Sequence, residues 1–261
     1  MQPYILDEKY LTPETRAFYQ QVLITLLDSK IPFLAGGAYA LGCYTGIVRD
    51  TKDFDVFVHP RDAMKILEAL AHVDYKTELT DEVWLGKAFE GDNLVDVVFG
   101  SANGIAMVDD EWFTHARDVR FLNLTANLIP PEEMIWSKSF IMTRDRYDGA
   151  DIAHIILKCA RCLDWERILR RFGPDWRILY NYLILFGYIY PSERSLIPLW
   201  VLEEMKIRLE KETEASPHTE RVCRGTLLST TQYTTDIEKW GYCDPRPARR
   251  TACSRAWKVE I

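Results

Sequence analysis

The sequence predicts an α+β protein in which a mixed β-sheet domain with helices is followed by a mainly α-helical domain. Strand-like and helix-like segments alternate as far as residue 129, and from Pro130 onward the apolar residues recur at helical spacing. With 261 residues, 48% of them hydrophobic, the chain can bury the cores of two modest domains. We therefore expect domains at residues 1–129 and 130–247, followed by a disordered tail at residues 248–261.

The first helix is expected over residues 13–29. Thr12 can cap it, Pro13 suits its first turn, and apolar residues follow at helical spacing. The segments expected after it are a strand in "IPFLAGG", a short helix in "AYALGCYTGIV", a strand in "KDFDVFVHP", a helix in "RDAMKILEALAHV", a hairpin of "YKTELT" and "EVWLGKAFE", and a strand in "LVDVVFG". The helix after Pro60 should bury one face, made of Met64, Leu67, Leu70 and Ala71.

Helix-like segments make up most of the second half of the chain. In order, they are "PPEEMIWSKSFIMTR", "DGADIAHIILKCARCL", "DWERILRRF", "PDWRILYNYLILFGYIY" and "PLWVLEEMKIRLEKE". The polar segment "ETEASPHTE" is typical of a linker, and "RGTLLSTTQYTTDIEKWGY" beyond it is expected to end in a helix.

Composition indicates a cytoplasmic protein without a membrane segment. The N-terminus lacks a basic stretch followed by a long apolar run, and the other apolar runs are interrupted well before membrane-spanning length. Six irregularly spaced cysteines are too sparse for a disulfide framework, so reduced thiols are expected. The formal net charge of -7 argues against binding nucleic acid over the whole surface, although a local basic patch remains, made of Arg167, Arg170 and Arg171.

Two carboxylates separated by one residue open the strand in "TKDFDVFV". Because side chains alternate along a strand, Asp53 and Asp55 point to the same side, with Cα atoms about 6.6 Å apart at roughly 3.3 Å per residue. Burying both unpaired is costly, and a divalent cation such as Mg²⁺ would remove that cost. Asp96 in "NLVDVVFG" is the third candidate ligand, if its strand pairs beside the first. A solvated acidic pair at a turn or strand edge is the commoner alternative for such a pattern.

Two glycines, Gly36 and Gly37, end the preceding strand in "FLAGG". Without side chains they let backbone amides approach a phosphate, and the short helix that follows would offer its N-terminus. A tight strand-to-helix turn explains the same two residues, and the two interpretations are compatible. The full series of strand, diglycine, short helix and acidic strand is more specific than any one of its parts.

The segments "LAGG", "DFDV" and "VDVV", in this order, resemble the DNA polymerase β-like nucleotidyltransferase superfamily. Its signature is a hydrophobic residue, Gly, then Gly or Ser, followed by a carboxylate-x-carboxylate strand. The longer string "GGAYALGCYTGIVRDTKDFDVFV" is similar to the minimal bacterial branch that includes AbiEii-type toxins and uncharacterised nucleotidyltransferases, with Arg49, Thr51 and Lys52 in matching positions. In the second half the resemblance extends to Lys138, Arg144, Arg146, Asp148 and Asp151.

The resemblance implies a nucleotidyltransferase-fold domain that moves a nucleoside monophosphate from a nucleoside triphosphate, such as ATP, to a hydroxyl acceptor and releases pyrophosphate. Asp53 and Asp55 would bind one or two Mg²⁺ ions together with the triphosphate, and Asp96 would bind the second ion or accept the proton of the attacking hydroxyl. The resemblance also implies nucleotide-binding roles for Gly36, Gly37, Arg49 and Lys138.

The sequence leaves the acceptor open among a protein, an RNA end such as that of tRNA, and a small molecule. Likeness to the toxin branch also implies an antitoxin-like partner. The alternative function is a catalytically inactive module of the same fold that binds nucleotide or a partner protein. Ala38 favours this alternative, because a Ser or Thr often follows the glycines, whereas the three acids favour the enzyme. For Lys138 and Arg144, the solvated face of a helix is an equally good interpretation.

Overall fold

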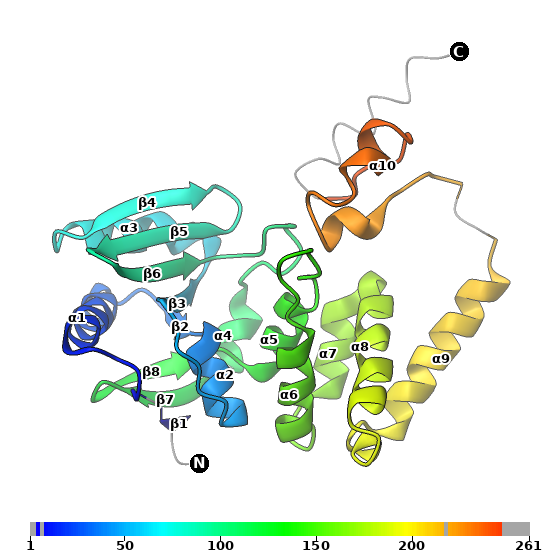
Figure 1. Cartoon of the computed structure of the whole chain (residues 1–261), viewed down its shortest axis with the longest axis horizontal. Coiled ribbons are helices and arrows are strands. Elements are labelled where there is room, and N and C mark those ends of the chain that lie inside the picture. The colour runs from blue at the N-terminus through cyan, green and yellow to red at the C-terminus, as the bar shows by residue number, and fades with distance from the viewer. Residues whose placement is uncertain (1–3, 6–7, 217–218, 247–261) are drawn as a thin grey trace. The chain divides into compact units, whose positions relative to one another are not determined.

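The computed structural model describes residues 4–5, 8–216 and 219–246, and the chain divides into two compact units. The first unit contains the residues up to Ala102 together with Ala106–Glu133, and the second contains Asn103–Ile105 and the chain from Met134 onward. A sheet with helices forms the first unit and helices form the second (Figure 1), which confirms the α+β class. The domain boundary at residues 129 and 130 stays a prediction, and the tail at residues 248–261 lies outside the described residues.

Within the described residues, eight strands form one mixed sheet in the order β1-β7-β8-β2-β3-β6-β5-β4. Their bounds are β1 Tyr4–Ile5, β2 Phe33–Ala35, β3 Asp53–Val58, β4 Lys76–Asp81, β5 Leu85–Glu90, β6 Asn93–Val98, β7 Arg117–Phe121 and β8 Leu124–Leu128. The pairs β3–β6, β2–β8 and β1–β7 are parallel, and the other neighbours are antiparallel. The strands and the hairpin expected up to β6 are therefore confirmed.

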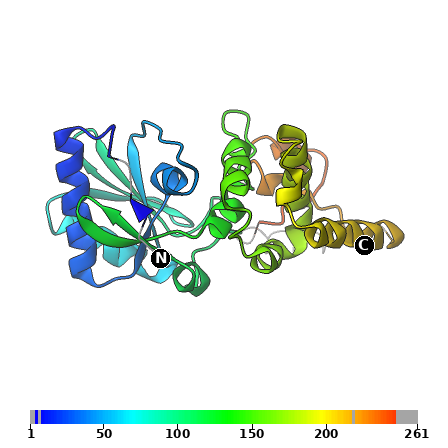
Figure 2. The same cartoon turned by 90° about the horizontal axis from the view of Figure 1, so that it is seen from below.

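Helix α1 spans Pro13–Ser29, as predicted. The Thr12 hydroxyl accepts a hydrogen bond from the Thr15 amide at 3.2 Å, which satisfies one of the free donors of the first turn. The helix packs against α3 (Ala63–Ala71), and both contact strands of the sheet (Figures 1 and 2). Tyr19 of α1 lies against Phe54 of β3, with ring centroids 5.4 Å apart. The face of β3 that carries Phe54 is therefore the covered face of the sheet.

The prediction of the apolar face of α3 is wrong for Met64 and Ala71, which are both exposed. After a 3-10 turn at Pro60–Asp62, the buried positions of α3 recur three and four residues apart, at Ala63, Ile66, Leu67 and Leu70. Met64 lies one residue, or about 100° of helix rotation, away from this stripe.

The strands β7 and β8 were not expected from the sequence. They form a hairpin whose two turn residues, Leu122 and Asn123, have φ angles of 53° and 65°. Tight hairpin turns of this kind usually contain glycine, because positive φ is unfavourable for residues with a β-carbon. The Leu122 amide donates to the Glu8 carboxylate at 3.0 Å, which helps to hold the turn. Two more helices belong to this unit, α2 (Gly37–Thr45) and α4 (Asp110–Thr114).

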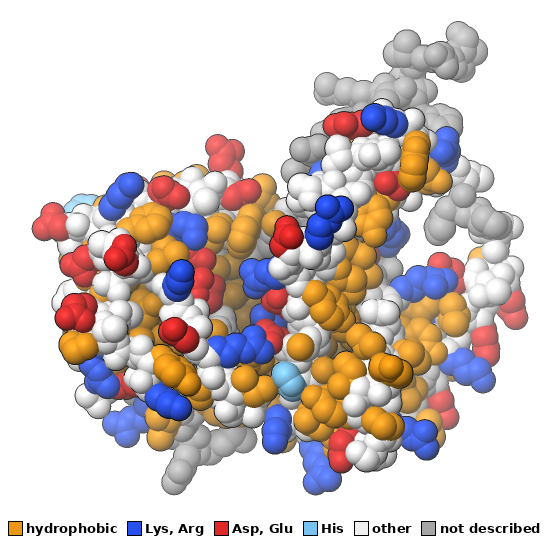
Figure 3. Space-filling view, in the orientation of Figure 1, with side chains coloured by type: hydrophobic (Ala, Val, Ile, Leu, Met, Phe, Trp, Pro, Cys, Tyr) orange, Lys and Arg blue, Asp and Glu red, His pale blue; other side chains and the backbone are white. Residues whose placement is uncertain are grey.

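Helices build the second unit, as expected. They are α5 (Pro131–Lys138), which begins in the first unit, α6 (Gly149–Cys159), α7 (Trp165–Phe172), α8 (Trp176–Ile189), α9 (Leu199–Glu214) and α10 (Thr234–Glu238). Helix α8 contacts α6, α7 and α9 and buries Leu179, Leu183 and Phe186. Hydrophobic side chains also lie on the outside of this unit (Figure 3). The exposed large hydrophobic residues of the chain include Ile184, Tyr188, Leu199 and Trp200.

Two expectations about charge and redox chemistry differ from the structure. Arg167 is buried, with 2% of its surface exposed, and Arg171 lies over the Trp136 ring at 5.0 Å, so the basic patch expected on α7 is reduced. Four cysteines are free, at positions 43, 159, 162 and 223, whereas Cys243 is disulfide-bonded. None of the described helices is both long and apolar enough to span a membrane.

Candidate active site

Three aspartates lie on one face of the sheet in the first unit. Asp55 of β3 and Asp96 of β6 are directly opposite each other in the parallel pairing, and Asp53 lies two residues before Asp55, opposite Leu94. Since side chains alternate along both strands, the three carboxylates share the face opposite to Phe54, Val56 and Val95, which are fully buried. The acids themselves are half-buried. The fold therefore brings the three predicted acids to one region of the sheet.

The diglycine fits directly against this region. Gly36 donates its amide to the Asp55 carbonyl at 2.9 Å, and a β-carbon at Gly36 would overlap the Phe57 ring. A β-carbon at Gly37 would overlap the Asp55 carboxylate, and Gly37 has a φ of 58°. Glycine is required at Gly37 for both reasons.

Helix α2 begins at Gly37, so its first turn lies beside the Asp55 carboxylate. The first amides of a helix have no partner inside the helix and favour nearby negative charge. Phosphate groups are among the anions that such a position suits.

Thr51 positions the first acid. Thr51 lies in the loop that precedes β3, and its hydroxyl donates a hydrogen bond to Asp53 Oδ1 at 2.6 Å. A short hydrogen bond of this kind restricts the carboxylate to one orientation. Thr51 is one of the residues that carry the family resemblance, and the structure shows that it contacts an acid of the site.

Lys87 is a member of the site that the sequence analysis did not identify. It lies on β5 opposite Asp96, and its ammonium is 2.7 Å from Asp96 Oδ1. The signal in the sequence is the length of the hairpin loop. Gly91 and Asp92 alone separate the paired residues Glu90 and Asn93, and this loop sets the register that pairs Lys87 with Asp96.

The chemistry of these residues fits a divalent cation such as Mg²⁺. Carboxylate oxygens are the ligands that Mg²⁺ prefers, and at Asp96 the Lys87 ammonium stands where a cation would bind. Within the described part of the chain, no group of three or more His, Cys, Asp or Glu side chains is placed so that it could hold a metal ion. Asp96, one of the three carboxylates, binds the Lys87 ammonium.

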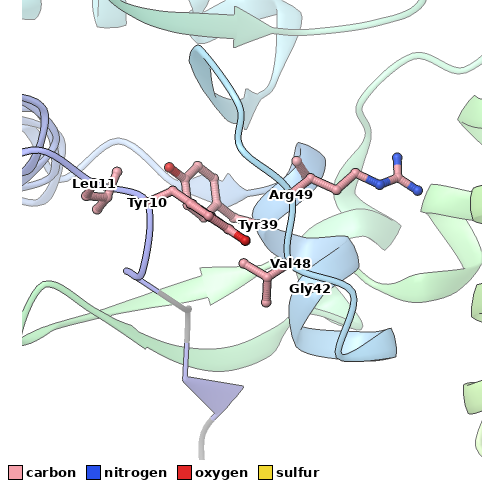
Figure 4. A pocket seen from close by; sticks show the side chains of 7 residues that line it. Tyr10, Leu11, Tyr39, Gly42, Val48 and Arg49 are labelled. Atoms are coloured by element: carbon pink, nitrogen blue, oxygen red, sulfur yellow. The ribbon is translucent and has the colours of Figure 1, made fainter.

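Arg49 lies beside a small pocket in the first unit, which Tyr10, Leu11, Tyr39 and Gly42 also line (Figure 4). The pocket has a volume of about 20 Å³, which is room for one water molecule. Figure 4 shows the Arg49 guanidinium pointing away from the Tyr10 and Tyr39 rings. The pocket therefore does not accommodate a nucleobase in this conformation.

Tyr39 interacts electrostatically with Asp53 and Asp50. The pKa of Tyr39 is raised to about 12, mainly by burial and also by the charges of Asp53 and Asp50, against a hydrogen bond with Tyr19 that lowers it. The phenol consequently keeps its proton near neutral pH. It can donate a hydrogen bond there and is not a base.

Lys138 belongs to the second unit, where acidic residues surround it. Its ammonium lies 2.7 Å from Asp148 and 3.0 Å from Asp151, and Arg146 also donates to Asp148, at 3.0 and 3.1 Å. Burial opposes ionisation of Asp148, but the hydrogen bonds and charges of Arg146 and Lys138 outweigh it and lower its pKa. Arg144 is exposed. The structure thus gathers the predicted Lys and Asp positions of the second unit into one ionic cluster.

Neither a protein-family model nor a curated protein matches the sequence. Several solved nucleotidyltransferases are similar in structure. The antibiotic-resistance factor ANT(2″)-Ia aligns with 68% of this chain and 99% of its own, at 14% identity and a TM-score of 0.47. The lincosamide antibiotic adenylyltransferase LnuA aligns with 56% of this chain and 98% of its own, at 17% identity and a TM-score of 0.39.

A third similar structure is the antigenic nucleotidyltransferase-like protein from Paracoccidioides brasiliensis. It aligns with 71% of this chain and 93% of its own, at 16% identity and a TM-score of 0.46. The more specific likeness to AbiEii-type toxins stays a prediction.

Proposed function

We propose that the chain is a magnesium-dependent nucleotidyltransferase that moves a nucleoside monophosphate from a nucleoside triphosphate to a hydroxyl acceptor. The observation that carries the proposal is the pairing of Asp55 with Asp96 across β3 and β6, with Asp53 on the same face and the first turn of α2 beside them. In a metal-bound triphosphate, carboxylates suit the metal ion and a helix N-terminus suits the phosphate groups.

In this proposal Asp53 and Asp55 hold Mg²⁺, with Thr51 orienting Asp53. When bound, the ion would neutralise charge on the phosphates and the leaving pyrophosphate. Asp96 accepts the proton of the acceptor hydroxyl, or binds a second ion. The hydroxyl oxygen forms a bond to the α-phosphorus while the bond between the α-phosphorus and the bridging oxygen breaks, and pyrophosphate leaves with that electron pair.

The triphosphate would lie along the first turn of α2, where Gly36 and Gly37 leave the backbone accessible. Arg49 is the proposed cationic partner of the phosphates, and the nucleotide-binding role of Lys138 stays a prediction. The proposed acceptors are a protein, a tRNA end or a small molecule, and an antitoxin-like partner belongs to the same proposal.

The test is transfer of label from each α-labelled nucleoside triphosphate to components of a cell extract, in the presence of Mg²⁺. We expect transfer by the wild type and its loss in the double variant Asp53→Asn with Asp55→Asn. Asp118→Asn is the matched control, because Asp118 is an exposed aspartate of β7 in the same sheet. Transfer that survives the double variant would refute the proposed roles of these acids.

A second candidate function is a catalytically inactive module that binds nucleotide or a partner protein. The ion pair between Lys87 and Asp96 favours it, because the third acid already has a cationic partner. Calorimetry with a non-hydrolysable triphosphate separates the two candidates. Binding that is retained by the double variant, together with an absence of transfer by the wild type, would support the module.

A further inference from the structure

Four charged side chains form a row across the sheet of the first unit. Glu78 of β4 is opposite Lys87 of β5, Lys87 is opposite Asp96 of β6, and Asp96 is opposite Asp55 of β3. Directly paired residues on neighbouring strands have side chains on the same face. Along this row the charges are therefore negative, positive, negative and negative.

Lys87 lies between two carboxylates and binds the inner one. Its ammonium is 2.7 Å from Asp96, and only 21% of the Lys87 side chain and 14% of the Asp96 side chain are exposed. Glu78, on the outer side, is exposed and accepts a hydrogen bond from Thr80 at 2.9 Å. A lysine has a long, flexible stem and a point charge, so its ammonium can move from one neighbouring carboxylate to the other.

The position of Lys87 has an electrostatic reason. Asp55 and Asp96 are adjacent, half-buried and of like charge, so their carboxylates repel each other. The Lys87 ammonium offsets this repulsion by binding Asp96. A divalent cation between the two acids would offset it as well, and the two cations cannot both occupy Asp96 Oδ1.

We propose that Lys87 is a built-in counter-cation that holds Asp96 until a divalent ion binds, and that it then moves toward Glu78. Lys87 would thereby set the metal affinity of the site. The inference rests on the proposed metal site, and it adds a residue that regulates when that site is complete.

The experiment is a Mn²⁺ titration of the full chain without nucleotide, followed by the electron paramagnetic resonance signal of free Mn²⁺. We expect Lys87→Met to bind Mn²⁺ roughly threefold to tenfold more tightly than the wild type, since a partly buried competitor is lost. Lys76→Met is the matched control, because Lys76 is an exposed lysine of the same hairpin that is opposite Phe89. It should change the affinity by less than twofold.

Glu78→Gln tests the second half of the proposal. Lys87 would lose its alternative partner, so Mn²⁺ should bind more weakly than to the wild type, by roughly twofold to threefold for an exposed pair. Asp55→Asn should abolish the binding that Lys87→Met enhances, which shows that the titrated site is the one described here. Should Lys87→Met not fold, as measured by its melting temperature, Lys87→Gln is titrated in its place.

Equal or weaker Mn²⁺ binding by the Lys87 variant would overturn the proposal, because Lys87 would then be a positioning residue that stays on Asp96. Failure of the wild type and the variant to bind Mn²⁺ would overturn it as well. Nucleotide transfer is measured separately. If the variant binds Mn²⁺ more tightly but no nucleotide transfer is detected, the proposed role of Lys87 stands and only the enzymatic function is refuted.

Discussion

The carboxylate of Asp55 lies against the backbone of Gly37, at the place where any other residue would put its β-carbon. The contact joins an acidic strand to the first turn of a helix without an intervening side chain. This geometry needs both the positive φ of Gly37 and the space that its missing side chain leaves. The two effects can be separated by mutation.

Gly37→Ala should destabilise the chain and disrupt the acids. Left-handed backbone strain costs roughly 1–2 kcal/mol for a residue with a β-carbon, and the overlap with Asp55 adds roughly 1–3 kcal/mol. Gly46→Ala is the control, because Gly46 has a φ of 76° and open space around it. Chemical denaturation should show a larger loss for Gly37→Ala, and only that variant should lose Mn²⁺ binding. Equal losses in both variants would show that the contact with Asp55 contributes nothing.

Thr51→Val should weaken catalysis with little effect on folding. The substitution keeps the shape of the side chain and removes the donor that lies 2.6 Å from Asp53. Loss of one such hydrogen bond to a carboxylate, worth roughly 1.5–3 kcal/mol, corresponds to a roughly 10-fold to 150-fold lower kcat/KM for nucleotide transfer. Thr25→Val in α1 is the control. It also removes a hydroxyl, which donates to a carbonyl of the same helix, and it should leave kcat/KM unchanged. A Thr51 variant with wild-type kinetics would exclude an orienting role.

Lys138→Met should destabilise the second unit strongly. The variant leaves Asp148 and Asp151 buried with less positive charge around them, and breaking a buried ionic group in this way costs roughly 3–5 kcal/mol. Lys158→Met, at an exposed position of α6, is the matched control and should be nearly neutral. Urea denaturation measures both free energies of unfolding. A neutral Lys138→Met would mean that this lysine is kept for another purpose, such as phosphate binding.

Acid should weaken the second unit through Asp148. Its pKa in the folded chain lies below the ordinary value of 3.8, so the unfolded chain binds the proton first as the pH falls. The stabilisation is therefore complete above about pH 4 to 5 and is lost as the pH falls through the lower, folded pKa. The free energy of unfolding should decrease less steeply below pH 4 in Asp148→Asn than in the wild type. Identical slopes would contradict the depressed pKa.

Much of the first unit could be predicted because its signals are local. Thr12 and Pro13 mark the start of α1, and the alternation in "DFDVFV" marks β3. The β7–β8 hairpin was missed because its turn contains Leu122 and Asn123 in place of the usual glycine. Its backbone conformation depends on contacts distant in sequence, such as the Glu8 carboxylate on the Leu122 amide.

The candidate site shows the same division. The acids and glycines could be identified from the sequence, because their residue types and spacing alone indicate metal and phosphate binding. Lys87 was harder to identify, because its role depends on strand register, and only the length of the β5–β6 loop indicates that it lies opposite Asp96. The ionic partners of Lys138 likewise depend on how α5 and α6 pack.

The parallel pairing of β3 with β6 also has a consequence for the order of folding. Between these strands the chain must first pass through α3 and the β4–β5 hairpin, so the two pairing partners meet by closing a long loop. Contacts of this kind carry a larger loop-closure cost than local hairpins and helices. A partly synthesised chain that lacks β6 therefore has no pair of Asp55 and Asp96.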